Sequence, residues 1–362
     1  MTDNPVALVV GATGLSGSHL AERLKNEGWT VVTLSRGAFD APWSDRHVAA
    51  DLEDANASRA ALADARDVSH VFYCTWSRQD SEDANVRVNG AMIRTLFAGL
   101  EQAPLRHAGL VTGLKHYLGP FEDYATSAPQ TPFLESQPRL PGPNFYYEQE
   151  DVLFEAAARR GLTWSVHRPH TMIGYALGNA MNMGVTLAVY ATICRHTGRP
   201  FLYPGSHAQY HGLTDITDAR ILADQILWAA TAEGAQNRAY NIVNGDIFRW
   251  RWMWGEIAGY FGLEPAGCPP TPRPLEDQMI DAASIWPDLV AAHGLQDKAV
   301  DRLASWWHTD ADLGREIECV TDMTESRLRG FNGYRSSRQS FFDVFDRLVA
   351  EKIIPDPKRK EA

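Results

Sequence analysis

Residues 6–20 read VALVVGATGLSGSHL, and this stretch decides the fold class. Five apolar residues, enough for a short buried strand, lead into glycines at positions 11, 14 and 17. Leucines then recur at helical spacing over residues 18–27, Gly28 is placed to end the helix, and residues 30–34 read as a second buried strand. This order predicts the βαβ unit of an α/β protein with a parallel, doubly wound sheet.

The alternation of strands and helices continues as far as residue 169. Strands are predicted at 47–50, 68–74, 107–112 and 162–168, and helices at 57–65, 85–100 and 148–160. We therefore expect a Rossmann-like nucleotide-binding domain over residues 1–175, followed by a smaller, mainly helical substrate lobe over 176–362. That lobe holds apolar helices at 183–194, a polar loop at 204–212 and a late strand at 239–243, which either stays in the lobe or rejoins the main sheet. Residues 354–360 read as a frayed tail.

Composition narrows the class of protein. The chain has 362 residues, 44% of them apolar, and a formal net charge of −11, which opposes nonspecific binding to nucleic acid or to an anionic membrane. No apolar stretch is long enough to span a bilayer, and the first residues do not resemble a signal peptide. The four cysteines are scattered without metal or disulfide spacing, so a cytoplasmic protein is expected.

The glycine turn predicts a dinucleotide site. Gly11, Gly14 and Gly17 stand between a strand and a helix, where backbone N–H groups and the positive helix end can meet a pyrophosphate. The spacing is G-x-x-G-x-x-G rather than the G-x-G-x-x-G of the dehydrogenase fingerprint, and a glycine pattern alone is a weak signal. The prediction therefore depends on the position of the glycines between a strand and a helix. The alternative is a tight turn that binds nothing.

The end of the second strand favours NADPH over NADH. Arg36 follows that strand, where an acidic residue would hold the ribose hydroxyl of NAD, and its planar guanidinium suits a 2′-phosphate. A solvated surface arginine is the alternative. Asp51 and Leu52 end the third strand and are placed to meet the adenine.

The catalytic residues break the usual rule of short-chain dehydrogenases, in which a tyrosine and a lysine lie four residues apart on one helix. Four residues after Tyr146 and Tyr147 stand Glu150 and Asp151, so a cation must come from elsewhere. Lys115 is the candidate, because it follows the strand at 107–112 and ligands gather at the carboxyl edge of such sheets.

Several stretches resemble one family, the progesterone 5β-reductase and iridoid synthase-like (PRISE) group of extended short-chain dehydrogenases/reductases. The matching stretches are residues 71–76 (VFYCTW), 112–122 (TGLKHYLGPFE), 144–147 (NFYY), 162–169 (LTWSVHRP) and 241–246 (NIVNGD). The resemblance covers essentially the whole chain. It implies an NADPH-dependent enone reductase that acts on a small hydrophobic α,β-unsaturated carbonyl compound.

The resemblance also implies roles for individual residues. Tyr146 would be the catalytic tyrosine, donating a hydrogen bond to the enolate oxygen, and Lys115 its partner, holding the ribose and keeping the phenol acidic. Tyr147 would be a wall of the pocket. Cofactor contacts, beyond the glycines, are implied for Thr13, Leu15, Ser16, Arg36, Asp51, Leu52, Thr75, Trp76, Met172, Asn179, Ala180 and Met181. Gly37 and Val111 depart from the family pattern, in which a second basic residue and a glutamine stand at these positions.

Other readings of the residues stay open or are set aside. His116, His167 and His170 lack metal-ligand spacing, so no metal is predicted. Trp250, Met253, Trp254 and Ile257 share one helical face and are expected to pack in a core. Three alternative functions stay open: a carbonyl (C=O) reductase, an NDP-sugar epimerase on the same fold, and a catalytically silent NADP-sensing protein. The oligomeric state is left open, a homodimer included.

Overall fold

The apolar strands predicted from the sequence build one seven-stranded parallel sheet. The computed structural model describes residues 4–120, 129–179 and 181–358. The sheet consists of β1 (Val6–Val10), β2 (Thr30–Ser35), β3 (Arg46–Ala49), β4 (His70–Tyr73), β5 (His107–Val111), β6 (Thr163–Pro169) and β10 (Arg238–Ile242). Their order is β10-β6-β5-β4-β1-β2-β3, and each neighbouring pair is parallel. This confirms the predicted doubly wound fold, whose strand order reverses between β1 and β4.

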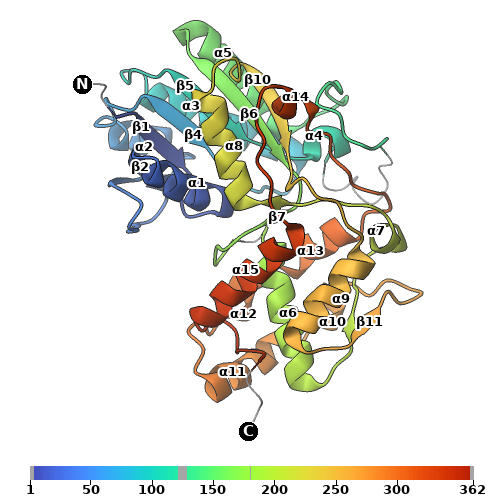
Figure 1. The fold of residues 1–362 in the computed structure, drawn as a ribbon. Helices are drawn as coiled ribbons and strands as arrows, with labels where there is room; N and C mark the ends of the chain where they lie inside the picture. The colour runs from blue at the N-terminus through green and yellow to red at the C-terminus, as the bar shows by residue number, and fades with distance from the viewer. Residues whose placement is uncertain (1–3, 121–128, 180, 359–362) are drawn as a thin grey trace.

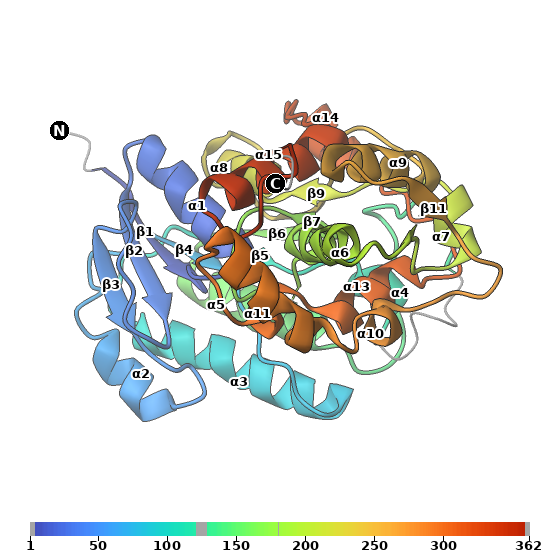
Figure 2. The ribbon, with the colours of Figure 1, turned by 90° about the horizontal axis from the view of Figure 1, so that it is seen from below.

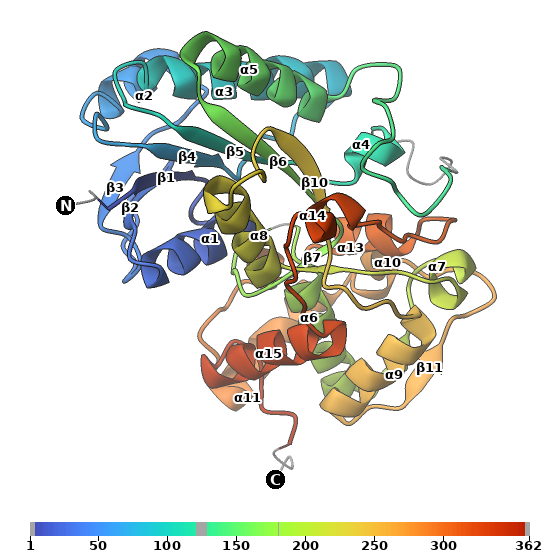
Figure 3. The ribbon, with the colours of Figure 1, turned by 45° about the horizontal axis from the view of Figure 1, so that its top comes forward.

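Helices cover both faces of the sheet (Figure 3). One face carries α2 (Ala55–Ala61), α3 (Glu82–Gly99) and α5 (Phe145–Arg160), and the other α1 (Leu15–Asn26) and α8 (Ala219–Thr231). Side chains alternate between the faces along each strand. Leu8 and Val10 therefore belong to the core under α3 and α5, whereas Ala7 and Val9 belong to the core under α1 and α8.

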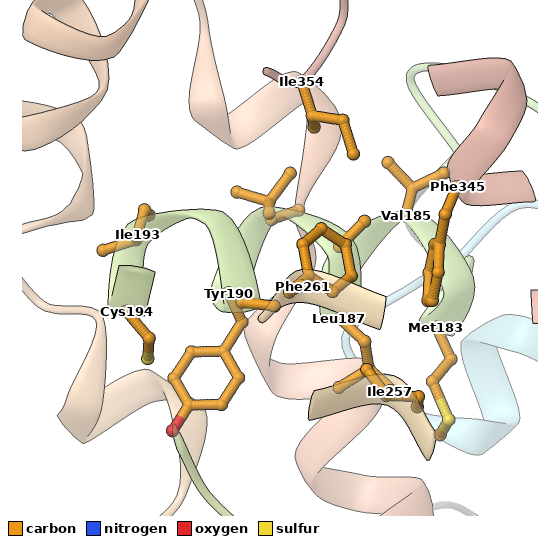
Figure 4. Packing of buried hydrophobic residues seen from close by; sticks show 14 of the residues in the cluster. Met183, Val185, Leu187, Tyr190, Ile193, Cys194, Ile257, Phe261, Phe345 and Ile354 are labelled. Carbon is orange, nitrogen blue, oxygen red and sulfur yellow. The ribbon is translucent and has the colours of Figure 1, made fainter. Parts of the chain in front are cut away.

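A second, mainly helical lobe lies below the carboxyl edge of the sheet (Figure 1). It contains α6 (Met183–Thr197), α9 (Trp250–Phe261), α10 (Leu275–Gln278), α11 (Ala282–His293), α12 (Val300–Leu303), α13 (Trp306–Leu313), α15 (Ser337–Ala350) and the strand pair β8 (Phe201–Leu202) and β11 (Pro265–Gly267). Figure 2 shows α6 in the centre of this lobe, and every residue of α6 from Met183 to Cys194 is buried. Figure 4 shows its side chains packed among those of α9 and α15.

The tryptophan-rich stretch packs as predicted. Trp250, Met253, Trp254 and Ile257 lie on one face of α9 and are buried in the core of the helical lobe. Trp252, on the opposite face, is 48% exposed.

Three helices begin three residues before the positions predicted for them. α1 begins at Leu15, after Gly14 in an extended conformation. In α3 the side chain of Ser81 caps the helix by accepting from Ala84 N, and in α5 Asn144 Oδ1 accepts from Tyr146 N at 3.0 Å. Because α3 and α5 begin earlier, Glu82 and Tyr146 lie in the first turns of helices rather than in the loops before them.

The chain returns to the sheet after residue 200. β10 pairs with β6, and α8 packs on α1. Shorter elements complete the fold: α4 (Lys115–Leu118), β7 (Met172–Ile173) paired with β9 (Thr217–Asp218), α7 (His207–His211) and α14 (Thr324–Leu328). α7 lies inside the stretch predicted as a polar loop.

The prediction of a frayed tail from residue 354 is wrong for its first part. Ile353 and Ile354 are buried in the core of the helical lobe, and Arg195 Nη1 donates to the carbonyl of Pro357 at 2.6 Å. Apolar burial therefore outweighs the basic, proline-containing composition as far as this point. No helix among the described residues is long and apolar enough to cross a bilayer.

Candidate active site

The glycine turn between β1 and α1 is tightly folded against the residues that follow β4. Gly11 has φ +80°, and a Cβ atom there would lie 2.8 Å from the carbonyl oxygen of Cys74. A Cβ atom on Gly17 would lie 2.3 Å from the carbonyl oxygen of Gly11. Larger residues at either position would force the turn apart, so only glycine lets α1 begin directly beside the strand.

A cavity of about 450 Å³ lies where the strands of the sheet end. Its walls come from the glycine turn, from the residues after β4, β5 and β6, and from α13 of the helical lobe. A neighbouring cavity of about 350 Å³ lies over the ends of β1, β2 and β3. The two share Gly11, Thr13, Arg36, Thr75, Trp76 and Arg78. Together they follow the carboxyl edge across the point where the strand order reverses, where dinucleotides bind in such sheets.

Most of the predicted cofactor residues line these cavities. The larger cavity is lined by Gly11, Thr13, Gly14, Leu15, Ser16, Arg36, Thr75, Trp76, Met172, Asn179 and Met181, and the neighbouring one also by Asp51 and Leu52. Gly17 differs, because it lies within α1, lines neither cavity and serves the packing of the turn instead. Ala180 lies outside the described residues.

The walls of these cavities fit the pyrophosphate and the adenosine part of a dinucleotide. Gly14 and Leu15 place the first turn of α1 at the cavity, where backbone N–H groups and the helix dipole favour an anion. Arg36, exposed at the end of β2, adds a cation where the two cavities meet. Leu52 is buried and contributes an apolar wall to the neighbouring cavity.

Lys115 and Tyr146 line the larger cavity together, although neither shares a helix with the other. Lys115 begins α4 and its side chain is 1% exposed, while Tyr146 lies in the first turn of α5. A Cβ atom on Gly113 would lie 3.5 Å from the Tyr146 hydroxyl, which therefore sits beside the loop that leads into α4.

Asn144 joins the lysine to the tyrosine helix. Its Nδ2 donates to the carbonyl of Lys115 at 3.0 Å, and its Oδ1 accepts from the backbone N–H of Tyr146, also at 3.0 Å. One buried side chain thus fixes α4 and the start of α5 in a single arrangement.

The phenol of Tyr146 is held in its protonated form. Burial raises its pKa above the usual value, and the negative charge of Glu82 raises it further. The role of Lys115 in keeping the phenol acidic stays a prediction. The ammonium of Lys115 lies 2.9 Å from Glu82 Oε2, so its charge is compensated within the protein.

Tyr147 does not form a wall of the cavity among the described residues. Its hydroxyl donates to the carbonyl of His116 at 2.7 Å and accepts from the backbone N–H of Leu140 at 2.9 Å. On a helix, adjacent residues point in different directions, so only one tyrosine of this pair faces the cavity.

A polar wall of the cavity was not predicted from the sequence. It is formed by His170, Thr171, His308, Asp312 and Arg315. Asp312 accepts from Thr171 Oγ1 at 2.7 Å and from Arg315 Nη2. Arg315 Nη1 lies 2.8 Å from His170 Nε2, and His170 Nδ1 lies 2.7 Å from Asp215 Oδ1. These residues come from distant parts of the chain, and no local motif marks them.

The other predicted structural histidines are buried away from the cavity. His167 Nδ1 lies 2.8 Å from Gln225 Oε1, and His116 Nε2 lies 3.3 Å from the carbonyl of Gln137. Within the described part of the chain, no group of three or more His, Cys, Asp or Glu side chains is arranged to hold a metal ion.

Comparison with known proteins identifies the family. Residues 45–355 match the family model described as a PRISE-like Rossmann-fold domain. This chain belongs to the PRISE family. A PRISE relative from Arabidopsis thaliana, named 3-oxo-Delta(4,5)-steroid 5-beta-reductase, is 39% identical, with 97% of this chain and 93% of the relative covered. An (S)-8-oxocitronellyl enol synthase of Camptotheca acuminata is 37% identical over the same shares of the two chains.

Solved structures with the same fold are more distant from this PRISE chain. The UDP-glucose 4-epimerase of Thermotoga maritima has a TM-score of 0.66 and 13% identity, covering 95% of this chain and 99% of its own. An epimerase-like protein of Burkholderia cenocepacia has a TM-score of 0.65 and 16% identity, covering 96% and 99%. At this identity the likeness shows the fold alone.

Proposed function

We propose that this PRISE protein reduces the C=C bond of α,β-unsaturated carbonyl compounds with NADPH as hydride donor. The observation that carries the proposal is that Lys115 and Tyr146 line one cavity with the glycine turn. The names of the relatives, a steroid 5-beta-reductase and an 8-oxocitronellyl enol synthase, support this reaction over sugar epimerisation.

NADPH bound along the glycine turn would supply a hydride to the β-carbon of the substrate. Negative charge then develops on the carbonyl oxygen, and Tyr146 donates a hydrogen bond to it. The phenol carries the proton that this hydrogen bond requires, since burial favours its neutral form and raises its pKa. Water supplies the proton that the α-carbon takes up, so one hydride and one proton add across the double bond.

Lys115 and Arg36 serve the cofactor in this proposal. Lys115 would hold the ribose of the nicotinamide, and the Arg36 guanidinium would hold the 2′-phosphate that distinguishes NADPH from NADH. The apolar residues Val111, Leu114 and Trp307 in the cavity wall favour a small hydrophobic enone as substrate. A reducing compartment such as the cytoplasm accords with four free cysteines, Cys74, Cys194, Cys268 and Cys319.

Product identification after incubation with NADPH and a panel of cyclic and acyclic enones tests the proposal. A saturated carbonyl compound formed in step with NADPH oxidation supports it. An allylic alcohol would show reduction at C=O instead, and NADPH binding without any product would leave only a cofactor-binding protein; either result overturns it.

A further inference from the structure

Glu82 lies behind the candidate site, at the point where three of its segments meet. It is the first residue of α3 and its side chain is 9% exposed. It is not among the described residues that line the cavity, and it would touch neither cofactor nor substrate.

The two carboxylate oxygens of Glu82 hold different segments. Oε2 accepts from Lys115 Nζ at 2.9 Å, and Oε1 accepts from the backbone N–H of Phe145 at 2.9 Å. That N–H is one of the groups at the start of α5 that have no partner within the helix. One carboxylate thus connects the lysine of α4 with the first turn of the helix that carries Tyr146.

The same end of α3 also fixes the loop after β4. Asn85 donates to Glu82 Oε2 at 3.2 Å and accepts from Gln79 N at 2.8 Å. Asn89, one turn further, accepts from Ser77 N and donates to the carbonyl of Ser77, both at 2.8 Å. This loop carries Thr75 and Trp76, and the Trp76 ring stacks on that of Phe145 with centroids 5.0 Å apart.

We propose that Glu82 is a positioning residue for the reduction, whose carboxylate holds Lys115 and the start of α5 so that Lys115 and Tyr146 keep one spacing. The inference rests on the proposed function for what this spacing serves. A carboxylate is required because the Lys115 ammonium is buried, and a buried cation needs a compensating charge to stay in one place.

The substitution Glu82→Gln removes the negative charge and leaves the shape of the side chain nearly unchanged. The amide keeps the length of the side chain and one acceptor for Phe145 N, but it no longer compensates the ammonium. We expect the lysine to leave its single arrangement, and the affinity for NADPH to fall because a disordered ammonium meets the ribose less often. With a working enzyme, kcat falls more than KM for the enone rises, because Tyr146 acts on the transition state and its position relative to the cofactor held by Lys115 is lost.

The experiment measures NADPH affinity by cofactor fluorescence, and kcat and KM with 2-cyclohexen-1-one, in four variants. These are Glu82→Gln, Lys115→Met, the double variant and Glu148→Gln as a matched control. Glu148 also joins α5 to α3, but through an ion pair with the exposed Arg94 rather than with Lys115. Circular dichroism and thermal unfolding confirm that each variant is folded.

The proposal predicts that Glu82→Gln weakens NADPH binding and lowers kcat only when Lys115 is present. Glu82→Gln weakens NADPH binding about fivefold and lowers kcat about tenfold in the unsubstituted protein, and changes both by less than about twofold in the Lys115→Met background. Glu148→Gln leaves both unchanged. Equal losses in both backgrounds, or wild-type values in Glu82→Gln, would overturn the role of Glu82.

The role of Glu82 can still be tested if the protein reduces no enone or if Lys115→Met does not fold. If the unsubstituted protein reduces no enone, the proposed function fails. The NADPH affinities of the variants then still test the role of Glu82. If Lys115→Met does not fold, Glu82→Asp replaces it. The shorter carboxylate keeps the charge but cannot span both partners, so we expect it to lose kcat as Glu82→Gln does. Wild-type kcat in both Glu82 variants would overturn the proposal.

Discussion

The guanidinium of Arg78 stacks over the ring of Trp307, with its central carbon 3.9 Å from the ring centroid. Arg78 follows β4, at the carboxyl edge of the sheet, whereas Trp307 lies in α13 of the helical lobe. Both line the larger cavity, so this cation–π contact connects the two parts of the protein across the candidate site.

Removing this contact is expected to weaken cofactor retention without unfolding the protein. An exposed cation–π contact contributes about 1 kcal/mol, so Arg78→Leu should raise KM for NADPH by about threefold to tenfold. The matched control is Arg347→Leu, because Arg347 lies 3.8 Å from the ring of Tyr175 outside the cavity. Initial rates at varied NADPH check this, and equal KM values in the two variants would contradict it.

The buried pair of Lys115 and Glu82 predicts a characteristic pattern of stability. Breaking a buried ion pair on one side leaves an uncompensated charge, so Lys115→Met should lower the free energy of unfolding by about 3 kcal/mol. Adding Glu82→Gln should restore a large part of this loss, because both charges are then gone. Urea unfolding of the two variants measures the difference. A double variant less stable than Lys115→Met would contradict the prediction.

Arg36 is expected to set the preference for NADPH. A charge-assisted hydrogen bond to the 2′-phosphate contributes about 2 kcal/mol, so Arg36→Ser should weaken NADPH binding about thirtyfold. NADH, which lacks this phosphate, should bind the variant as it binds the unsubstituted protein. Arg46→Ser is the control, since Arg46 pairs with Asp67 on the surface and does not line the cavities. Fluorescence titration with NADPH and NADH measures these affinities. Equal losses of affinity for the two cofactors in Arg36→Ser would contradict the assignment of Arg36 to the 2′-phosphate.

Buried histidines predict a loss of stability in mild acid. Burial lowers the pKa of His107 to about 3 and that of His167 to about 4. The unfolded chain therefore takes up protons as the pH falls below about 6.5, while the folded protein does not, and unfolding becomes more favourable. Each such histidine lowers the free energy of unfolding by about 1.4 kcal/mol per pH unit between its two pKa values.

Urea unfolding at about pH 6 and about pH 5 measures this slope. His107→Gln should reduce it by the contribution of one proton, because the variant removes a group that protonates only in the unfolded chain. An unchanged slope would show that His107 is protonated in the folded protein as well.

The sequence predicts the sheet well because buried parallel strands leave a clear local signal. The carboxyl edge of the sheet was predicted correctly from the run Val6 to Val10, the glycines after it and the strand at 107–112. Lys115 was expected at this edge. Helix starts were less predictable, because Ser81 and Asn144 act as caps only when their side chains turn back onto the helix.

The residues missed at the site are those that only the folded chain brings together. Glu82 meets Lys115 across 33 positions of sequence, and Arg315 meets His170 across 145. No spacing rule connects such pairs, because α3 and α4 bring Glu82 and Lys115 together, and Arg315 reaches His170 only where the helical lobe meets the sheet. For the same reason the ion pair of Lys115 with Glu82 has no part in the expectation that Lys115 keeps the phenol of Tyr146 acidic.

The most direct measurement compares Tyr146→Phe with Tyr147→Phe, following NADPH oxidation with an enone and identifying the product. Tyr146 faces the cavity, whereas the Tyr147 hydroxyl is bonded to His116 and Leu140. Removing an oxyanion donor costs about a hundredfold or more in kcat, so Tyr146→Phe should lose that much saturated carbonyl product while its NADPH affinity stays unchanged. Tyr147→Phe should keep most of the activity. Saturated product formed by Tyr146→Phe at the rate of the unsubstituted protein would contradict the account.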